Sequence, residues 1–304
     1  MIEELRGQLQ SLMPFAQNAK VLLACSGGAD STFLAHAYQK IAADTDLPPA
    51  VVAVVDHGQQ ANSAEFTANV VRGFQNAGFE VCSKRIELGS KSSENQMREG
   101  RYAALIEMAT TNAATHILFA HHADDVAETV LQRIMRGTGI NGLAGIRSSR
   151  QLAPQIQLFR PLLRMRRQQI INYLRENEVP WHEDLSNFNI EYATRNKIRH
   201  HLLPQLSEVA TGDPSLALIK LATEAQDWQQ GVEDLLDQDI PFKVLPSYFR
   251  RQALRRELIN CGETVSPQRL SDLEGALLKK GSATINAALR FSTSGGKLLV
   301  VSRR

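Results

Sequence analysis

The sequence predicts an α/β fold, a doubly wound parallel sheet, followed by a second, smaller and mainly helical domain that ends in a β-hairpin. Through residue 135, short and almost continuously apolar segments alternate with segments of helical periodicity. This alternation is typical of parallel strands that helices cover on both faces. Beyond residue 210 the pattern is mainly helical. We therefore expect residues 1–210 to form the first domain and residues 211–304 the second.

The elements of the first domain follow in regular alternation. Strands are predicted where a short apolar segment is bounded by glycine or polar residues. These segments are 21–24, 51–55, 81–88 and 117–120. Helices are predicted where apolar residues recur with helical spacing, at 31–42, 65–77, 97–110, 123–135, 165–177 and 195–203. Residues 1–6 open a further amphipathic helix, without the basic and then apolar order of a signal peptide.

The second domain follows a predicted turn at 211–214. Its helices are expected at 215–237, 247–261 and 266–280. A hairpin is expected from 287–293 and 298–302, which flank Ser294-Gly295-Gly296. We expect this domain to act in substrate choice rather than chemistry, because it lacks the acid–base clusters that follow the strands of the first domain.

Composition indicates an ordinary globular protein. The chain has 304 residues, of which 43% are hydrophobic and 22% charged, and this length suits about two domains. No apolar run approaches the ~18 residues of a membrane span, so we expect no membrane partner. Cys25, Cys82 and Cys261 lie far apart without a CxxC motif. This spacing argues against a disulfide framework or a zinc site and favours a reducing cytoplasm.

The most informative segment is Ser26-Gly27-Gly28-Ala29-Asp30-Ser31, directly after the first apolar strand. Paired glycines let backbone N–H groups close around an anion, and the next helix directs the positive end of its dipole there. No lysine follows the glycines, so this is not a Walker loop. The segment predicts a phosphate-binding loop of another kind; the alternative is a glycine turn with an Asp or Ser helix cap.

Polar residues gather after three of the predicted strands. They are residues 26–31, Asp56-His57 and residues 121–125. The C-terminal ends of parallel strands meet at one edge of a sheet, where ligands bind in folds of this class. We therefore expect these residues to form one site.

Acidic residues beside a phosphate-binding loop would repel the phosphates, so their presence there needs a chemical explanation. Asp30 lies inside the phosphate loop, where a negative charge is favourable if it holds Mg²⁺ or takes a proton from a nucleophile. Asp124 and Asp125, with Glu128 one turn later, could complete a metal site or hold a substrate amine; the alternative for Asp124 is a helix cap. Carboxylates favour Mg²⁺ over Zn²⁺.

Positive charge is unevenly distributed along the chain. Between Glu128 and Glu176 there is no acidic residue and no lysine, but there are nine arginines. They are Arg133, Arg136, Arg147, Arg150, Arg160, Arg164, Arg166, Arg167 and Arg175. Beside a nucleotide site they predict a polyanionic partner such as RNA, and the alternative is a solvated basic face. Arg195 and Arg199 could clamp a triphosphate or simply line one helix face.

Taken in order, the motifs resemble a known family. The loop at 26–31 is followed by Asp56-His57-Gly58, Glu94-Asn95-Gln96 with Arg98, Arg101 and Tyr102, His121-His122-Ala123-Asp124-Asp125 with Glu128, Arg136-Gly137-Thr138-Gly139, Arg160-Pro161-Leu162-Leu163, Asp184-Leu185-Ser186-Asn187, and Arg195-Asn196 with Arg199. The loop alone resembles the SGGxDS signature of the N-type ATP pyrophosphatases. The whole series, over residues 18–204, is similar to the tRNA(Ile)-lysidine synthetase family.

Four features depart from the pattern of that family, and two of them are Cys25 before the loop and Gly100 in place of an alanine. Gln59-Gln60 differs from the residues that usually follow the Asp-His-Gly motif. The chain also ends without the extra C-terminal domain of longer members, so it resembles a shorter or a truncated form. The helical tail resembles the substrate-binding domain of the family more weakly.

The resemblance implies a Rossmann-like PP-loop ATPase domain that uses ATP and Mg²⁺. It implies tRNA(Ile) with a CAU anticodon and free lysine as partners, and it leaves a homodimer open. ATP would adenylate C2 of the wobble cytidine with release of pyrophosphate. Lysine would then displace AMP and form lysidine.

The resemblance also implies roles for particular residues. Asp30 and Arg195 are expected to be catalytic, with Asp30 also a metal ligand, and Asp124 and Glu128 to hold the lysine ammonium. The residues expected to contact ATP are Ala24, Ser26, Gly27, Gly28, Ala29, Asp30, Ser31, Thr32, Asp56, His57, Arg98, His121 and Arg199. Those expected to contact tRNA are Arg133, Arg136, Arg147, Arg150, Arg166 and Arg167.

Two other functions remain open at this stage. A tRNA thiolase would use the same ATP chemistry, but such enzymes usually need a set of cysteines that carries a persulfide or binds a cluster, and there is no CxxC here. A regulatory module would bind ATP without turnover. The presence of Asp30, Arg195 and Arg199 argues against it.

Overall fold

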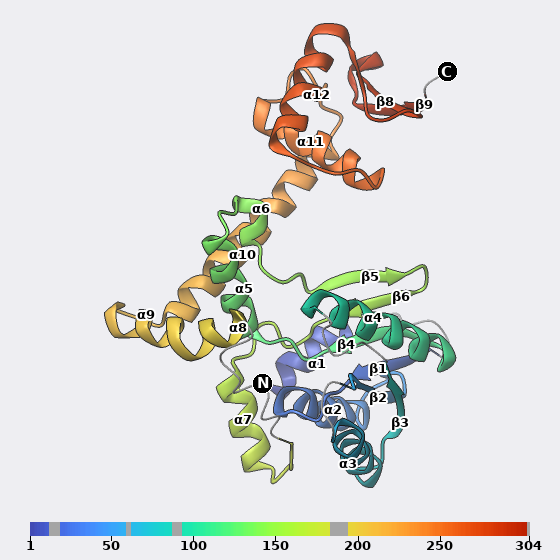
Figure 1. The fold of residues 1–304 in the computed structure, drawn as a ribbon, viewed down its shortest axis with the longest axis vertical. Coiled ribbons are helices and arrows are strands. Elements are labelled where there is room, and N and C mark those ends of the chain that lie inside the picture. The colour runs from blue at the N-terminus through green and yellow to red at the C-terminus, as the bar shows by residue number, and fades with distance from the viewer. Residues whose placement is uncertain (12–18, 59–61, 87–92, 183–193, 303–304) are drawn as a thin grey trace. The chain divides into compact units, whose positions relative to one another are not determined.

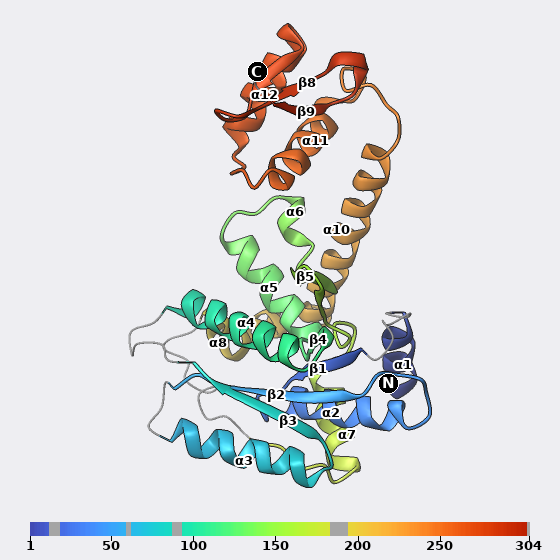
Figure 2. The ribbon, with the colours of Figure 1, turned by 90° about the vertical axis from the view of Figure 1, so that its right-hand side faces the viewer.

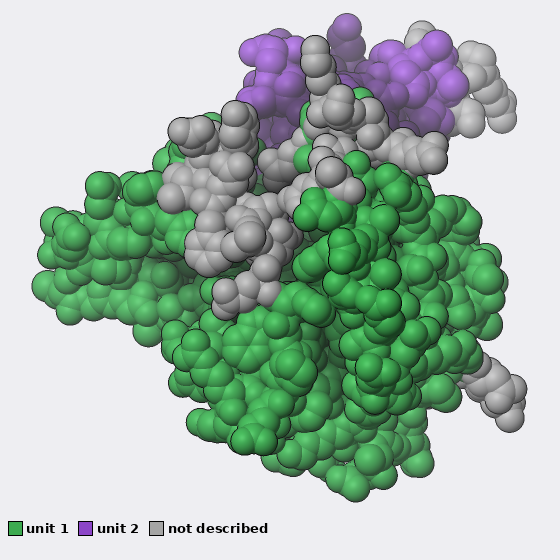
Figure 3. Space-filling model, turned by 60° about the horizontal axis from the view of Figure 1, so that its bottom comes forward, with its two compact units in different colours: residues 1–223 green, residues 224–304 purple. Residues whose placement is uncertain are grey.

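The computed structural model describes residues 1–11, 19–58, 62–86, 93–182 and 194–302, and its chain divides into two compact units, 1–223 and 224–304 (Figure 3). We expected a boundary after residue 210. The units divide later because the first part of α10 (Pro214–Leu236) belongs to the first unit. There, Leu218 and Ala222 of α10 join Val126 and Val130 in one apolar cluster.

The first unit is built on a six-stranded sheet in the order β3-β2-β1-β4-β6-β5 (Figure 1). Its strands are β1 (Lys20–Ala24), β2 (Ala50–Asp56), β3 (Glu80–Arg85), β4 (Ala114–Phe119), β5 (Ser149–Ala153) and β6 (Ile156–Phe159). Neighbours pair in parallel except β5, which runs antiparallel to β6. The doubly wound sheet is confirmed, and it gains β5 and β6, which the sequence pattern did not indicate.

Helices cover both faces of this sheet (Figure 2). The apolar core of one face includes residues of α1 (Ile2–Gln10), α2 (Ala29–Ala42), α3 (Ser63–Asn76) and α7 (Arg167–Glu176). On the other face lies α4 (Glu94–Thr111), whose Leu105 and Met108 share a core with Leu22 and Ile117. Because β1 is enclosed from both sides, its sequence is apolar at successive positions instead of alternating.

Further helices follow β4 in the first unit. They are α5 (Ala123–Met135), α6 (Ile140–Leu143), α8 (Thr194–Lys197), the π-helical turn η2 (Ile198–Leu202) and α9 (Leu203–Val209). The helix expected at 195–203 continues to Val209, because Pro204 stands in the first turn of α9, where a missing N–H costs no hydrogen bond. The Asp-Leu-Ser-Asn motif at 184–187 lies outside the described residues.

The second unit contains the rest of α10, helices α11 (Ser247–Asn260) and α12 (Pro267–Lys280), and a three-stranded antiparallel sheet. The strands are β7 (Ser282–Thr284), β8 (Leu289–Ser292) and β9 (Leu299–Ser302), so the predicted hairpin has a third strand beside it. Leu254, Leu277 and Phe291 lie fully buried in a core of its own. Within the described ranges, no helix is long and apolar enough to cross a membrane.

Candidate active site

The phosphate loop lies between β1 and α2. Gly28 is the N-cap of α2 in an extended conformation, and Gly27 has a φ of 83°, a left-handed value that suits glycine. A Cβ atom at Gly27 would lie 2.5 Å from Cγ2 of Val70 on α3, so the loop excludes a side chain there. The first N–H groups of α2 have no partner within the helix and can bind an anion.

Hydrogen bonds hold the loop in this shape. The Ser31 hydroxyl donates to the Gly28 carbonyl oxygen at 3.0 Å and accepts from the Ser26 N–H at 3.2 Å. The Thr32 hydroxyl and the backbone N–H of His182 both donate to the Gly27 carbonyl oxygen, at 3.3 and 2.9 Å. The loop is therefore fixed both by its own side chains and by a segment more than a hundred residues later.

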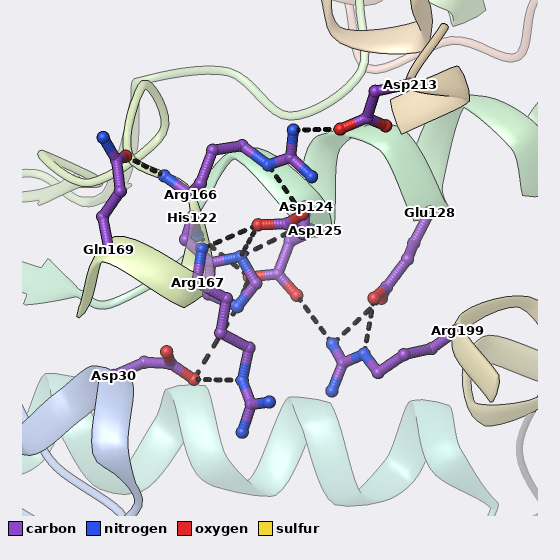
Figure 4. Close-up of polar contacts among 10 residues, drawn as sticks. All are labelled: Asp30, His122, Asp124, Asp125, Glu128, Arg166, Arg167, Gln169, Arg199 and Asp213. Atoms are coloured by element: carbon purple, nitrogen blue, oxygen red, sulfur yellow. Dashed lines mark hydrogen bonds and ion pairs between the residues drawn. The ribbon is translucent and has the colours of Figure 1, made fainter. Parts of the chain in front are cut away.

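Through His122 and Arg167, Asp30 joins a network of acidic and basic side chains (Figure 4). One carboxylate oxygen of Asp30 is 3.7 Å from Nε2 of His122 and 3.6 Å from Nε of Arg167. The other oxygen, Oδ1, is buried and has no hydrogen-bond partner. Since buried carboxylate oxygens are normally satisfied, this atom fits the role of a ligand to a hard cation.

Asp124 is held by the start of α7 (Figure 4). Its carboxylate accepts from Nε of Arg166 at 2.9 Å and from the backbone N–H of Arg167 at 2.8 Å. Arg166 also donates to Asp213 at 2.8 Å, and Asp213 in turn accepts from the N–H of Ser215 in α10. Asp124 is not the cap of α5: His122 is, in a capping box with Asp125. Asp124 instead connects α5 with α7 and, through Arg166, with α10.

Glu128 and Asp125 face Arg199 from α5. Glu128 is 1% exposed and accepts from Nε of Arg199 at 2.6 Å, and Asp125 lies 3.5 Å from the same guanidinium. Burial raises the pKa of Glu128, Arg199 opposes this effect and Asp125 adds to it, so the net shift is upward. Burial also raises the pKa of Asp125, but the charges of the two neighbouring histidines outweigh it and the net shift is downward.

Arg195 and the end of β2 provide the remaining groups. Arg195 donates to the Thr129 hydroxyl at 2.9 Å, next to Glu128 on α5. Asp56 is buried and accepts from the N–H of Gly58 at 2.8 Å. Nδ1 of His57 is buried without a hydrogen-bond partner, and burial together with Arg101 lowers the pKa of His57. An imidazole nitrogen without a hydrogen-bond partner thus lies at this edge of the sheet.

The six arginines expected to contact tRNA fall into two groups. Three are exposed: Arg136, Arg147 and Arg150. The other three have partners within the chain. Arg133 donates to the carbonyl oxygens of Gly142 and Gly145, at 2.6 and 2.8 Å, while Arg166 and Arg167 belong to the network around Asp30 and Asp124. Contacts within the chain therefore engage half of the predicted RNA surface.

The sequence patterns assigned no role to His122 or to Asp213, and they indicated Asp125 only as a possible metal or amine ligand. His122 is 2% exposed and lies within 3.7 Å of carboxylate oxygens of Asp30, Asp124 and Asp125. The spacing of a polar residue and an acidic residue three positions later, at the start of a helix, is the signature of a capping box. That signal was present in the sequence, but it predicts a helix start and not a site.

Comparison with known proteins agrees with this geometry. Residues 1–206 match the family model of a PP-loop domain, which makes the chain a PP-loop protein. A U34-tRNA thiolase from Methanococcus maripaludis, solved with its [4Fe-4S] cluster, superposes with a TM-score of 0.58 at 15% identity, over 73% of this chain and 78% of that one. At that identity, the likeness shows the fold alone.

Comparison with curated relatives identifies the family within the PP-loop class. A tRNA(Ile)-lysidine synthase from Solibacter usitatus is 37% identical over 206 residues, which are 66% of this chain and 44% of that protein. One from Nostoc sp. is 31% identical over 295 residues, which are 89% of this chain and 83% of that protein. The chain belongs to the tRNA(Ile)-lysidine synthase family. It spans about half the length of most of the curated relatives it matches.

Proposed function

We propose that this protein is an ATP-dependent carbon–nitrogen ligase of the cytoplasm. It would adenylate C2 of the wobble cytidine of tRNA(Ile) with a CAU anticodon and join free lysine to that carbon. The observation that supports this most is the placement of Asp30, which belongs to the phosphate loop and also to the network of Asp124, Asp125 and Glu128. Phosphate binding and amine binding would therefore meet in one site.

In the first step, the C2 oxygen of the cytidine attacks the α-phosphorus of ATP. The bond from that phosphorus to the bridging oxygen breaks, and pyrophosphate leaves. The N–H groups at the start of α2 would hold the phosphates, and Arg195 and Arg199 would stabilise the charge that develops on the phosphoryl oxygens. Ala24, Asp56 and His57, at the ends of the adjacent strands β1 and β2, would border the nucleotide.

A magnesium ion would neutralise phosphate charge in this step. Asp30 is the residue that fits it, because its Oδ1 is buried and unpartnered. The described residues contain no group of three or more His, Cys, Asp or Glu side chains placed to hold a metal. Phosphate oxygens and water would therefore supply most of the ligands, as is usual for Mg²⁺.

In the second step, the lysine amine attacks C2, the C2–O bond breaks, and AMP leaves. The ammonium must first lose a proton, and to accept that proton is the alternative role of Asp30, in place of binding Mg²⁺. Asp124 and Glu128 would attract the lysine ammonium. Each is engaged by an arginine, Asp124 by Arg166 and Glu128 by Arg199, so lysine would share or replace these contacts.

Cys25, the cysteine beside the phosphate loop, does not support the alternative function as a thiolase. Cys25 is 4% exposed, and its Sγ lies 3.6 Å from the carbonyl oxygen of Ser31. Burial raises the pKa of the Cys25 thiol far above its usual range. Because the thiolate is the nucleophile in persulfide chemistry, Cys25 is poorly suited to carry sulfur.

The proposed reaction is tested by its nucleotide products. The protein is incubated with ATP labelled in the α-phosphate, lysine and a tRNA(Ile) transcript. We expect AMP and pyrophosphate, formed only when tRNA is present. Formation of ADP, or ATP cleavage that does not depend on tRNA, contradicts the proposal. Light scattering on the same preparation determines whether the protein forms a homodimer.

A further inference from the structure

Two arginines from separate elements lie over one tyrosine ring. The guanidinium carbon of Arg98, on α4, is 5.3 Å from the centroid of the Tyr102 ring, and that of Arg150, on β5, is 4.9 Å from it. Arg98 and Arg150 are exposed, whereas Tyr102 is half-buried. The contact is therefore a surface feature, built from residues that lie about fifty positions apart in the sequence.

The ring of Tyr102 is fixed by a stack of aromatic residues behind it. Its centroid is 5.7 Å from that of Phe119, and the Phe119 ring stacks on His121 with 15° between the planes. His121 accepts a hydrogen bond from Nε of Arg160 at 3.2 Å, and Arg160 also donates to the carbonyl oxygen of Arg147 at 2.8 Å. Arg160 is 5% exposed, so this support is buried beneath the surface.

Among the residues that the structure describes, no ion pair joins Arg98 or Arg150 to a carboxylate. Burial lowers the pKa of Arg160, Tyr102 opposes this effect, and Arg150 and Arg98 add smaller effects that lower the pKa further. Burial likewise lowers the pKa of Arg101, with Arg98 contributing in the same direction. Glu99, the acidic neighbour of Arg98, accepts a hydrogen bond from Asn95 instead. Arginines held together against their mutual repulsion indicate a site for an anion.

The position of the cluster favours RNA over the nucleotide. The phosphates of ATP already have the N–H groups at the start of α2 and the loop of residues 26–31. The exposed guanidinium groups of Arg98 and Arg150 suit a chain that crosses the surface rather than a small molecule enclosed in a cleft. Arginine side chains stacked on an aromatic ring are also well suited to hold a phosphodiester in fixed geometry, since the guanidinium fork remains free to bind oxygens.

We propose that Arg98, Arg150 and Tyr102 form a subsite for a backbone phosphate of the RNA substrate. This inference rests on the proposed function and gives Arg98 a role toward RNA in place of the expected contact with ATP. Arg160 and Arg101 support the subsite from within. Tyr102 positions the two guanidinium groups and does not itself take part in the reaction.

The test is the double variant Arg98→Gln/Arg150→Gln, compared with Lys40→Gln/Arg72→Gln, which removes the same charge from two other exposed basic side chains. Binding of a tRNA(Ile) transcript with a CAU anticodon is measured over a range of salt concentrations, and ATP binding is measured separately. We expect the first variant to bind tRNA about tenfold more weakly near 0.15 M salt, with a salt slope smaller by about 1.5. We expect the control to stay close to the wild type and the ATP affinity of both to change less than about twofold.

Two results overturn the subsite. One is an unchanged salt slope in Arg98→Gln/Arg150→Gln, and the other is a loss of ATP binding with tRNA binding retained, which would assign the cluster to the nucleotide. If the double variant unfolds, the single variant Arg150→Gln, on an exposed strand at the edge of the sheet, is used instead. The same salt slope of tRNA binding is then measured. Lysine transfer by the wild type is measured in parallel. If the wild type transfers no lysine, the proposed function is refuted. If the wild type transfers lysine and the variant binds tRNA as the wild type does, only the subsite is refuted.

Discussion

At the scale of single residues, Gly27 determines whether the phosphate loop can form. Gly27→Ala would place a Cβ atom 2.5 Å from Val70 and force a left-handed backbone on alanine, at a cost of about 1–2 kcal/mol before any clash. We expect ATP affinity to fall about tenfold or more, measured by titration calorimetry. Gly73→Ala on α3 is the matched control, because no atom lies within 4 Å of the added Cβ. Unchanged ATP binding in Gly27→Ala would contradict the account of the loop.

A substitution at Asp30 tests the chemistry of the site and leaves the shape of the phosphate loop unchanged. Asp30→Asn keeps the volume of the side chain and removes the charge that faces His122 and Arg167. We expect lysine transfer to fall by about two orders of magnitude or more, the usual effect of removing one acid–base or charge-stabilising group. Melting temperature is recorded as the check on folding. Activity within about threefold of the wild type would remove Asp30 from the mechanism.

The residues of the phosphate loop could be predicted from sequence, because the loop, its glycines and its helix are contiguous. The partners of the acidic residues could not. Glu128 is paired with Arg199, and Asp124 with Arg166, over separations along the chain that no local pattern encodes. Periodicity assigned Asp124 and Glu128 to one helix face, and only the packing of α7 and η2 against α5 shows what they bind.

At the scale of elements, one buried carboxylate of α12 accepts hydrogen bonds from three residues of α11, beside the apolar core that the two helices share. Glu274 is 5% exposed and accepts from Nε of Arg251 at 2.7 Å and from Nε of Arg250 at 2.8 Å, with the Ser247 hydroxyl at 3.1 Å. Burial alone would raise its pKa, but these donors outweigh burial, so the pKa of Glu274 is lowered. We expect Glu274→Gln to destabilise the second unit by about 2 kcal/mol at pH 7.

The pH dependence of this effect follows from its sign. A carboxyl group whose pKa is lower in the folded state stabilises above its unfolded pKa of about 4.3 and loses that contribution as pH falls through the folded value. The difference between wild type and Glu274→Gln should therefore be constant from pH 7 to about pH 5 and shrink below it. Hydrogen exchange of the α12 amides measures it. A difference that persists undiminished near pH 3 would contradict the assigned ion pairs.

There is also a physical reason why the sequence predicted some strands and missed others. The strands β1, β2 and β4 are apolar because they are enclosed on both faces, and their composition identified them. The strands β5 and β6 are only five and four residues long, and β5 (Ser-Arg-Gln-Leu-Ala) has an exposed, polar half at the edge of the sheet. A short edge strand of this composition cannot be distinguished from a loop by periodicity.

At the scale of the whole molecule, the division into two units predicts where the chain can be shortened. A chain that ends at residue 210 loses Leu218 and Ala222, which cover Val126 and Val130 of α5. A chain that ends at residue 223 keeps them. We expect the 1–223 form to be more stable than the 1–210 form by about 3 kcal/mol, from apolar area, as measured by urea unfolding. Equal stability would show that the start of α10 does not belong to the first unit.

The central claim is that this chain transfers lysine to the wobble cytidine of tRNA(Ile). The most direct measurement is the incubation of the protein with ATP, labelled lysine and a tRNA(Ile) transcript with a CAU anticodon, followed by nuclease digestion and identification of the labelled nucleotide. The account predicts one labelled nucleotide, at the wobble position, that depends on ATP and is lost in Asp30→Asn. Absence of label from the RNA with an active ATP-binding preparation, or label at another nucleotide, would contradict it.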